Sequence, residues 1–131
     1  MALIFRTLHA TKEADALNQE WMILENTGAN AVTSAGCALT ISKKANERPH
    51  PLGTLDPGFV LQPQEKVRLV TGTPSKKSQG APPAEDGIKN YHLFLKERVL
   101  RGPGTVVRIS LKQHELAKAV FAPTAKNGIE D

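Results

Sequence analysis

The stretch that decides the fold of this chain is Glu20-Trp21-Met22-Ile23-Leu24-Glu25-Asn26-Thr27-Gly28. The four residues from Trp21 to Leu24 form an unbroken apolar run, which is too short for a self-sufficient helix. Asn26, Thr27 and Gly28 follow at once and are typical of a turn. A short apolar run closed by turn residues is typical of a strand covered on both faces. We therefore expect residues 20–26 to form a central strand.

Segments with alternating or β-branched residues indicate shorter strands around this one. They are residues 3–9, 31–42, 59–61, 66–71, 91–95, 105–111 and 116–121, with a brief pairing near 52–55. In the segment 66–71, Val67 and Leu69 should face the core, whereas Lys66 and Arg68 should face solvent. About seven to nine short strands without a convincing helix predict an all-β fold, an antiparallel immunoglobulin-like β-sandwich.

Composition limits the classes that remain. The chain has 131 residues, a hydrophobic content of 40% and one cysteine, Cys37, so it fits a single ordered domain without an internal disulfide. No apolar run approaches the roughly 18 residues of a membrane span. The apolar run Ala2-Leu3-Ile4-Phe5 has only four residues before Arg6, so no signal peptide is visible. The sequence favours the cytoplasm, unless a signal was removed, without determining the compartment.

Two segments lack an apolar pattern that could be buried. Residues 72–89 contain three prolines and three glycines, which predicts a mobile loop. Residues 123–131 should form a flexible C-terminal tail, so that the single domain spans residues 1–122. The strands 3–9 and 116–121 are candidate sheet edges, where a protein partner or a second copy could add a strand.

Residues 17–28, Leu-Asn-Gln-Glu-Trp-Met-Ile-Leu-Glu-Asn-Thr-Gly, read as an acid-aromatic-apolar strand that ends in Asn-Thr-Gly. Three further segments follow in order: residues 34–39 are Ser-Ala-Gly-Cys-Ala-Leu, residues 61–72 are Leu-Gln-Pro-Gln-Glu-Lys-Val-Arg-Leu-Val-Thr-Gly, and residues 99–109 are Val-Leu-Arg-Gly-Pro-Gly-Thr-Val-Val-Arg-Ile. Together the four segments resemble the lamin tail domain family, over about residues 3–122. The first resembles the opening of that domain, and the other three resemble its Leu-Ser-Gly-Trp-Thr-Leu, Leu-x-Pro-Gly-x-x-Val-x-Leu-x-x-Gly and Val-Trp-Asn-Asn-x-Gly-Asp-x-Val-x-Leu segments. The two family tryptophans fall at Cys37 and Leu100, and the Asn-Asn turn falls at Arg101-Gly102. Trp21 could refill part of the missing aromatic volume.

This resemblance implies an immunoglobulin-like sandwich that acts by binding. In lamins such domains bind DNA, chromatin and proteins, and in bacteria they are often appended to secreted or surface proteins and nucleases. We therefore expect a non-catalytic module for protein binding or scaffolding, with no cofactor.

The residues with catalytic potential also favour a non-catalytic role. The chain's four histidines are His9, His50, His92 and His114. No two of them have metal-ligand spacing, so we expect no metal site. Cys37 could meet a histidine in space, but its core position predicts a buried, inert thiol. Glu20 and Glu25 flank one strand at an odd separation, so they face opposite sides and cannot act as a pair. An enzyme using Cys37 or a histidine is the alternative that the sequence favours least.

Basic residues provide the other functional hypothesis. The formal net charge is +4, and residues 66–118 hold eleven Lys or Arg against four Asp or Glu, which indicates an anionic partner. The candidate basic face consists of Lys66, Arg68, Arg98, Arg101 and Arg108. If their strands are neighbours in one sheet, they form a stripe suited to weak, sequence-independent nucleic-acid binding. A merely soluble basic surface is the alternative.

Overall fold

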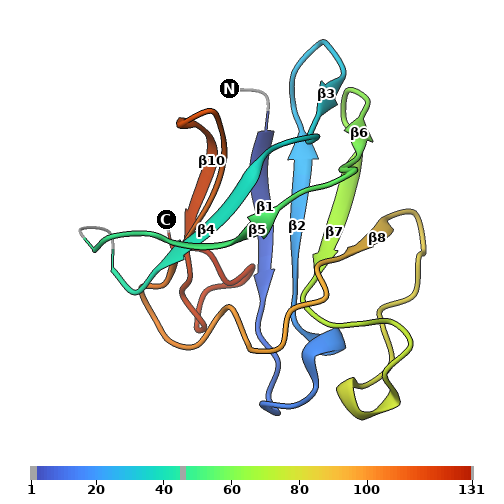
Figure 1. Cartoon of the computed structure of the whole chain (residues 1–131), viewed down its shortest axis with the longest axis vertical. Coiled ribbons are helices and arrows are strands. Elements are labelled where there is room, and N and C mark those ends of the chain that lie inside the picture. Colours follow the sequence, from blue (N-terminus) through green and yellow to red (C-terminus); the bar gives the residue numbers. More distant parts are fainter. Residues whose placement is uncertain (1–2, 45–46, 131) are drawn as a thin grey trace.

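The central strand forms where the sequence predicted it, as β2 (Trp21–Asn26) of a two-sheet sandwich (Figure 1). The computed structural model describes residues 3–44 and 47–130. β2 lies between its neighbours β1 (Leu3–His9) and β7 (Lys66–Val70), and both pair with it antiparallel. The predicted all-β sandwich is confirmed.

The first sheet has the strand order β1-β2-β7-β8, and β8 is Lys89–His92. β8 runs parallel to β7, an exception to the predicted antiparallel pairing. The second sheet has the order β10-β9-β4-β5, which are His114–Val120, Val106–Leu111, Ala38–Ser42 and His50–Thr54. A small sheet pairs β3 (Val32–Thr33) with β6 (Val60–Leu61), and two short 3₁₀ helices, η1 (Leu17–Gln19) and η2 (Lys77–Gln79), lie in connections.

The core lies between the two large sheets. Alternate residues of β2, Met22 and Leu24, are fully buried there with Leu69 of β7 and Ile109 of β9. Ile23 points to the opposite face and is still only 9% exposed, so β2 is covered on both sides as expected. Since each buried aliphatic side chain contributes roughly 1.5–3 kcal/mol, these residues anchor the fold.

The two positions that the resemblance aligned with tryptophans hold smaller residues in this chain. Cys37 and Leu100 are both buried in the core cluster. Trp21 does not refill that volume, because it lies on the outer face of the first sheet. There its indole stacks on His9 at 4.4 Å between ring centroids, and the Arg68 guanidinium lies 4.9 Å from it. Period-two alternation explains the outcome, since the neighbouring Met22 faces the core.

The predicted edge strands are sheet edges, but they adjoin each other and are covered. β1 and β10 are neighbours across the sandwich, with the C-terminal end beside them (Figure 1). The Leu8 amide donates to the Asn127 carbonyl at 2.9 Å, and the Glu130 amide donates to the Val120 carbonyl at 2.8 Å. Residues 123–130 thus follow a defined path along these strands, which the sequence did not indicate. We call this side, β1 and β10 with the tail, the closed edge.

The opposite sides of the sheets end in β5 and β8, and we call this side the open edge. The segment predicted as a mobile loop joins β7 to β8 here and includes η2. The side-chain amide of buried Asn18 donates to the carbonyls of Thr73 and Gly80, both at 2.9 Å. The Asn90 side chain donates to the Pro83 carbonyl at 2.7 Å. These bonds fasten the loop at three points, and its mobility stays a prediction.

Candidate interaction groove at the open edge

The five predicted basic residues do not form one stripe. Lys66 and Arg68 lie on β7 in the first sheet, whereas Arg108 lies on β9 in the second sheet. Both strands turn their apolar residues toward the shared core, so these basic side chains project from opposite outer faces of the sandwich. Arg98 and Arg101 lie in the connection that precedes β9. The basic stripe required β7 and β9 to be neighbours in one sheet, and they lie in different sheets.

Several of these side chains also have partners within the chain. Arg68 donates to the Ala84 carbonyl at 3.2 Å and to Asn90 Oδ1 at 3.0 Å. The Arg108 side chain is 17% exposed and pairs with Glu115 at 3.2 Å. Arg101 pairs with Glu97 and donates from Nε to the Arg98 carbonyl. Lys66 is exposed on its strand. Arg68 and Arg108 therefore stabilise local structure.

Two adjoining cavities lie at the open edge of the sandwich. The first has a volume of about 400 Å³ and lies between β5 and the segment that runs from β8 to Leu95. The second, of about 520 Å³, lies between β6, the start of β7 and residues 85–91. Both are lined by Asn90 and Tyr91, so they are adjoining parts of one groove, which we call the open-edge groove.

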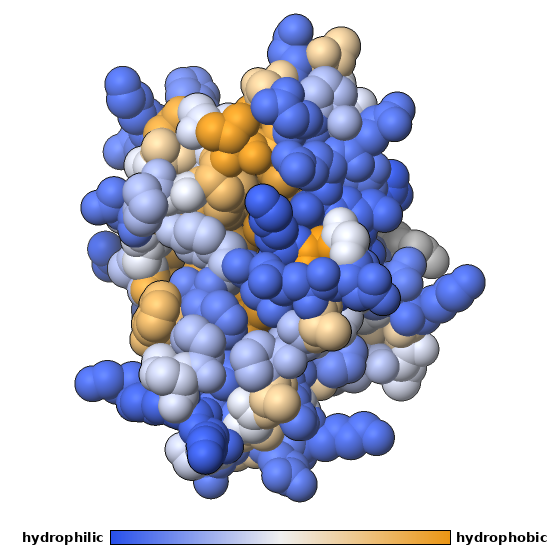
Figure 2. Space-filling view, turned by 90° about the vertical axis from the view of Figure 1, so that its right-hand side faces the viewer, coloured by the Kyte–Doolittle hydropathy of each residue, from blue (hydrophilic) through white to orange (hydrophobic). Residues whose placement is uncertain are grey.

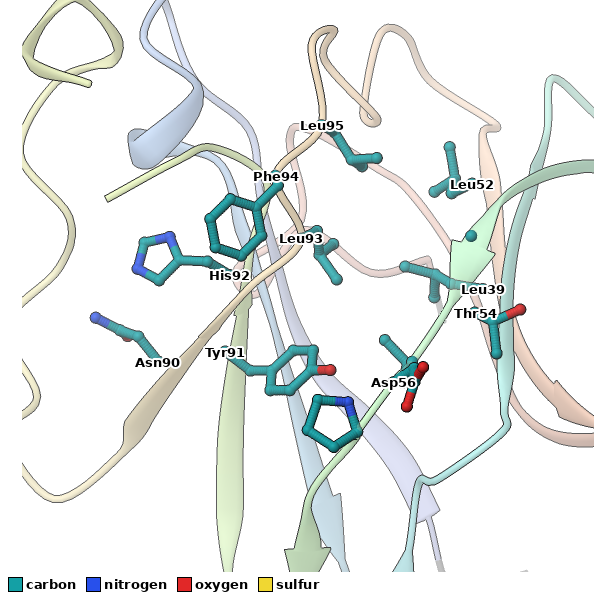
Figure 3. A pocket seen from close by; sticks show the side chains of 13 residues that line it. Leu39, Leu52, Thr54, Asp56, Asn90, Tyr91, His92, Leu93, Phe94 and Leu95 are labelled. Carbon is teal, nitrogen blue, oxygen red and sulfur yellow. The ribbon is translucent and has the colours of Figure 1, made fainter. Parts of the chain in front are cut away.

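The first cavity takes side chains from both sheets. In Figure 3, Tyr91 and Leu93 point toward Leu39 and Leu52 of the second sheet and toward Asp56, which follows β5. Asn90 and His92 project to the other side of their strand.

Phe94 stands at the rim of this cavity and is 61% exposed. Its φ angle is +55°, in the left-handed region that costs a bulky residue about 1–3 kcal/mol. The amides on either side of it are fastened to the first sheet: Leu93 donates to the Val70 carbonyl at 2.8 Å and Leu95 to the Thr71 carbonyl at 2.9 Å. These two bonds hold the strained residue and leave its ring in solvent.

Val60 occupies the corresponding position in the second cavity and is 56% exposed. Beside it, Phe59 packs edge-to-face on Tyr91 at 5.2 Å between centroids. The Tyr91 hydroxyl in turn accepts a hydrogen bond from the Gly58 amide at 3.2 Å. Figure 2, viewed from the side of β8, shows apolar surface among mainly hydrophilic side chains. Among the described residues, Val60 and Phe94 are the large hydrophobic residues that are exposed.

Sequence reasoning missed this groove, although part of its signal was present. Alternation in the segment 91–95 places Tyr91, Leu93 and Leu95 on one face, which leaves Phe94 on the other with His92. That pattern predicts an outward aromatic ring. The pairing of β8 with β7 and the approach of β5 bring together residues more than 30 positions apart, and no local pattern indicates that.

The two glutamates and the cysteine considered above lie in defined surroundings. Glu20 is fully buried, and its carboxylate accepts hydrogen bonds from Thr71 Oγ1 at 2.7 Å, the Val99 amide at 2.7 Å and the Leu100 amide at 3.0 Å. Glu25 pairs instead with Arg6. Cys37 is fully buried, and desolvation by burial raises the pKa of its thiol. The predicted burial of Cys37 is confirmed, and a raised pKa favours the protonated thiol, which is the less nucleophilic form.

Two further observations concern metals and membranes. Across residues 3–44 and 47–130, no three His, Cys, Asp or Glu side chains gather in a way that could hold a metal ion. The same part of the chain contains no helix of sufficient length and apolarity to span a membrane.

Comparison with known proteins gives no match to a protein-family model and no match to a curated protein. The resemblance to the lamin tail domain therefore rests on the four sequence segments alone.

Proposed function

We propose that this chain is a non-catalytic interaction module that binds an extended segment of a partner protein in the open-edge groove. The observation that carries the proposal is the pair of exposed apolar side chains, Val60 and Phe94, in adjoining cavities of one groove. Both side chains lie in concave parts of the surface that a partner's apolar side chains could fill. The strain at Phe94 supports the same reading, because strained residues concentrate at functional sites.

The strands that flank the groove suit an extended ligand. β5 and β8 are each the last strand of their sheet, so each leaves one side of its backbone without a neighbouring strand. An added strand gains main-chain hydrogen bonds, and its alternate side chains can enter pockets. The β8 edge is partly occupied, because the Asn90 amide donates to Glu85 at 2.7 Å. Since Glu85 is exposed, a partner's carbonyl could replace it.

The resemblance to the lamin tail domain agrees with this proposal, since it implies a binding module with an immunoglobulin-like sandwich. The nucleic-acid alternative has lost its geometric basis, because Lys66 and Arg68 lie on one face and Arg108 on the other.

A selection from a displayed library of random 12-residue peptides tests the proposal. The full chain is the target, and Phe94→Asp is the counter-target. Binding should enrich peptides with apolar residues at every second position, and Phe94→Asp should weaken their binding at least about tenfold, or 1.4 kcal/mol.

The matched control is Leu116→Asp. Leu116 is a half-buried apolar residue on β10 at the closed edge. The folded fraction of the Leu116→Asp protein should bind the peptides as tightly as the original chain does. If enriched peptides bind Phe94→Asp as tightly as the original chain, or if no peptide is enriched over the counter-target, the groove is not the binding site and the proposal fails.

A further inference from the structure

A third cavity, separate from the open-edge groove, lies at the end of the second sheet. Its volume is about 480 Å³, and it is lined by the end of β4, the start of β5 and residues 99–105. Apolar groups from Ile41, Val99 and Pro103 line it. This volume falls within the roughly 300–1,000 Å³ of small-molecule sites, which are mainly apolar with a few polar groups.

The polar groups of this cavity are mostly basic. Lys43, His50 and Arg101 all line it, and they come from three separate segments of the chain. Among the described residues, none that lines the cavity is an aspartate or a glutamate. Of the five basic residues predicted from sequence, only Arg101 lies here. The cavity therefore combines an apolar body with a cationic rim.

Hydrogen bonds fix the walls of the cavity before any ligand arrives. The backbone at Val99 is held by the Glu20 carboxylate at 2.7 Å. The turn at the other wall is closed by Thr105 Oγ1, which donates to the Gly102 carbonyl at 2.8 Å. The Gly104 amide donates to the Phe121 carbonyl at 2.9 Å. Glu20 accepts three hydrogen bonds in all, from Thr71 Oγ1 and the amides of Val99 and Leu100. Such preorganisation reduces the entropy that binding must lose.

The Arg101 guanidinium is available to bind the carboxylate of a ligand. Its ion pair with Glu97 joins two side chains that are 57% and 78% exposed, and exposed pairs of this kind contribute little. Its stem is positioned by the bond from Nε to the Arg98 carbonyl at 3.1 Å. A ligand carboxylate can therefore replace Glu97 at the guanidinium without a large cost.

We propose that this cavity binds a small amphipathic monocarboxylate. The hydrocarbon body would lie against Ile41, Val99 and Pro103, and the carboxylate would meet Lys43 and Arg101. The charge complementarity selects an anion, and the apolar walls select one with a hydrocarbon chain or ring over a bare ion such as inorganic phosphate. This site shares no lining residue with the open-edge groove, so it is independent of the proposed protein binding.

Titration of the ¹⁵N-labelled full chain, followed by amide NMR shifts, tests the proposal. The probes are octanoate, octanol, octylammonium, acetate and inorganic phosphate. Octanoate should shift the amides of Val99, Gly102 and Thr105, and it should bind at least about tenfold more tightly than octanol, because octanol lacks the charge. Acetate and phosphate should bind more weakly than octanoate, because they lack the hydrocarbon body, and octylammonium should not bind at this site.

The double variant Lys43→Gln/Arg101→Gln should weaken octanoate binding at least about tenfold. Lys118→Gln/Lys126→Gln removes the same charge from exposed residues that line none of the three cavities, and it should bind octanoate as the original chain does. Equal binding of octanol and octanoate, equal loss in both double variants, or shifts confined to the open-edge groove would each overturn the proposal. A peptide ending in a free carboxylate that binds here more tightly than octanoate would also overturn it.

Discussion

The closed edge and the open edge end the same two sheets, yet they meet solvent in different ways. At the closed edge, β1 and β10 are neighbours, and residues 123–130 supply backbone hydrogen bonds such as Leu8 to Asn127. At the open edge, β5 and β8 frame a groove with Val60 and Phe94 exposed. Unpaired sheet edges invite association, and proteins usually cover them. The chain covers one edge with its own tail and leaves the other open, so the open edge is where we place the partner.

The largest expected effect on stability is that of replacing Glu20, whose carboxylate fixes the backbone of the segment that leads away from the open edge. Residues 93–100 lead from the groove back to β9, and Glu20 accepts from the amides of Val99 and Leu100. Glu20→Ala leaves these donors and Thr71 buried without an acceptor. We expect a loss of about 3–5 kcal/mol in the free energy of unfolding, measured by urea denaturation.

Glu25→Ala is the matched control, because it removes a glutamate from the other end of the same strand. The Glu25 side chain is 13% exposed, but its partner Arg6 is 51% exposed and can be hydrated when the pair is broken, so the variant should lose about 1 kcal/mol, clearly less than Glu20→Ala. Equal losses in the two variants would show that Glu20 does not hold the segment that leads from the groove.

The next effect concerns the closed edge. Gly128 has a φ angle of +74°, and a Cβ atom placed on it would lie 1.9 Å from the Leu8 carbonyl oxygen. Gly128→Ala should therefore detach the tail and cost about 1–3 kcal/mol, since buried backbone groups lose their partners. It should also turn the closed edge into a second open one. Sedimentation velocity should then show more self-association for Gly128→Ala than for the original chain at the same concentration.

Gly87→Ala tests whether this effect is specific. Gly87 has a φ angle of +86°, but a Cβ atom there meets nothing within 4 Å. The variant carries a similar backbone strain without the collision, so its sedimentation should match that of the original chain. Association in both variants would mean that the tail is not what covers β1 and β10.

A smaller effect separates stability from binding at the open edge. Phe94 is strained at φ +55° and mostly exposed, and asparagine adopts this conformation at lower cost. Phe94→Asn should raise the free energy of unfolding by about 1 kcal/mol while it weakens peptide binding. Val60→Asn should weaken binding without this gain, because Val60 has no such strain. A destabilised Phe94→Asn would show that the ring serves packing rather than a partner.

The smallest effect concerns the core behind the groove. The Leu55 amide donates to the Cys37 carbonyl at 2.8 Å, and Leu55 also lines the first cavity. Burial raises the pKa of the Cys37 thiol above its ordinary value of 9.0. The folded state therefore favours the protonated thiol, and this contribution is complete below pH 9 and is lost as the pH rises through the folded-state pKa.

Urea denaturation across alkaline pH measures this contribution. The stability of the original chain should fall more steeply above pH 9 than that of Cys37→Ala, which lacks the thiol. Identical alkaline slopes would mean that water reaches Cys37 through the groove and that its pKa is ordinary.

Local patterns predicted much of the fold and little of the site. The strand 3–9 has the predicted bounds, and Val67 and Leu69 face the core, because period-two alternation reports burial directly. The basic stripe was wrong because alternation says which residues face outward but not which strands share a sheet. The tail's bond to Leu8 and the bonds from Val99 and Leu100 to Glu20 join residues roughly 80 or more positions apart, so neither has a local signal.

Hydrogen–deuterium exchange on the full chain, with and without a peptide from the selection, tests the central claim most directly. We predict that the peptide slows exchange in residues 50–61 and 88–95, which form the open edge, and leaves residues 3–9 and 114–121 unchanged. Slower exchange confined to residues 3–9 and 114–121 would place the partner at the closed edge and contradict the account.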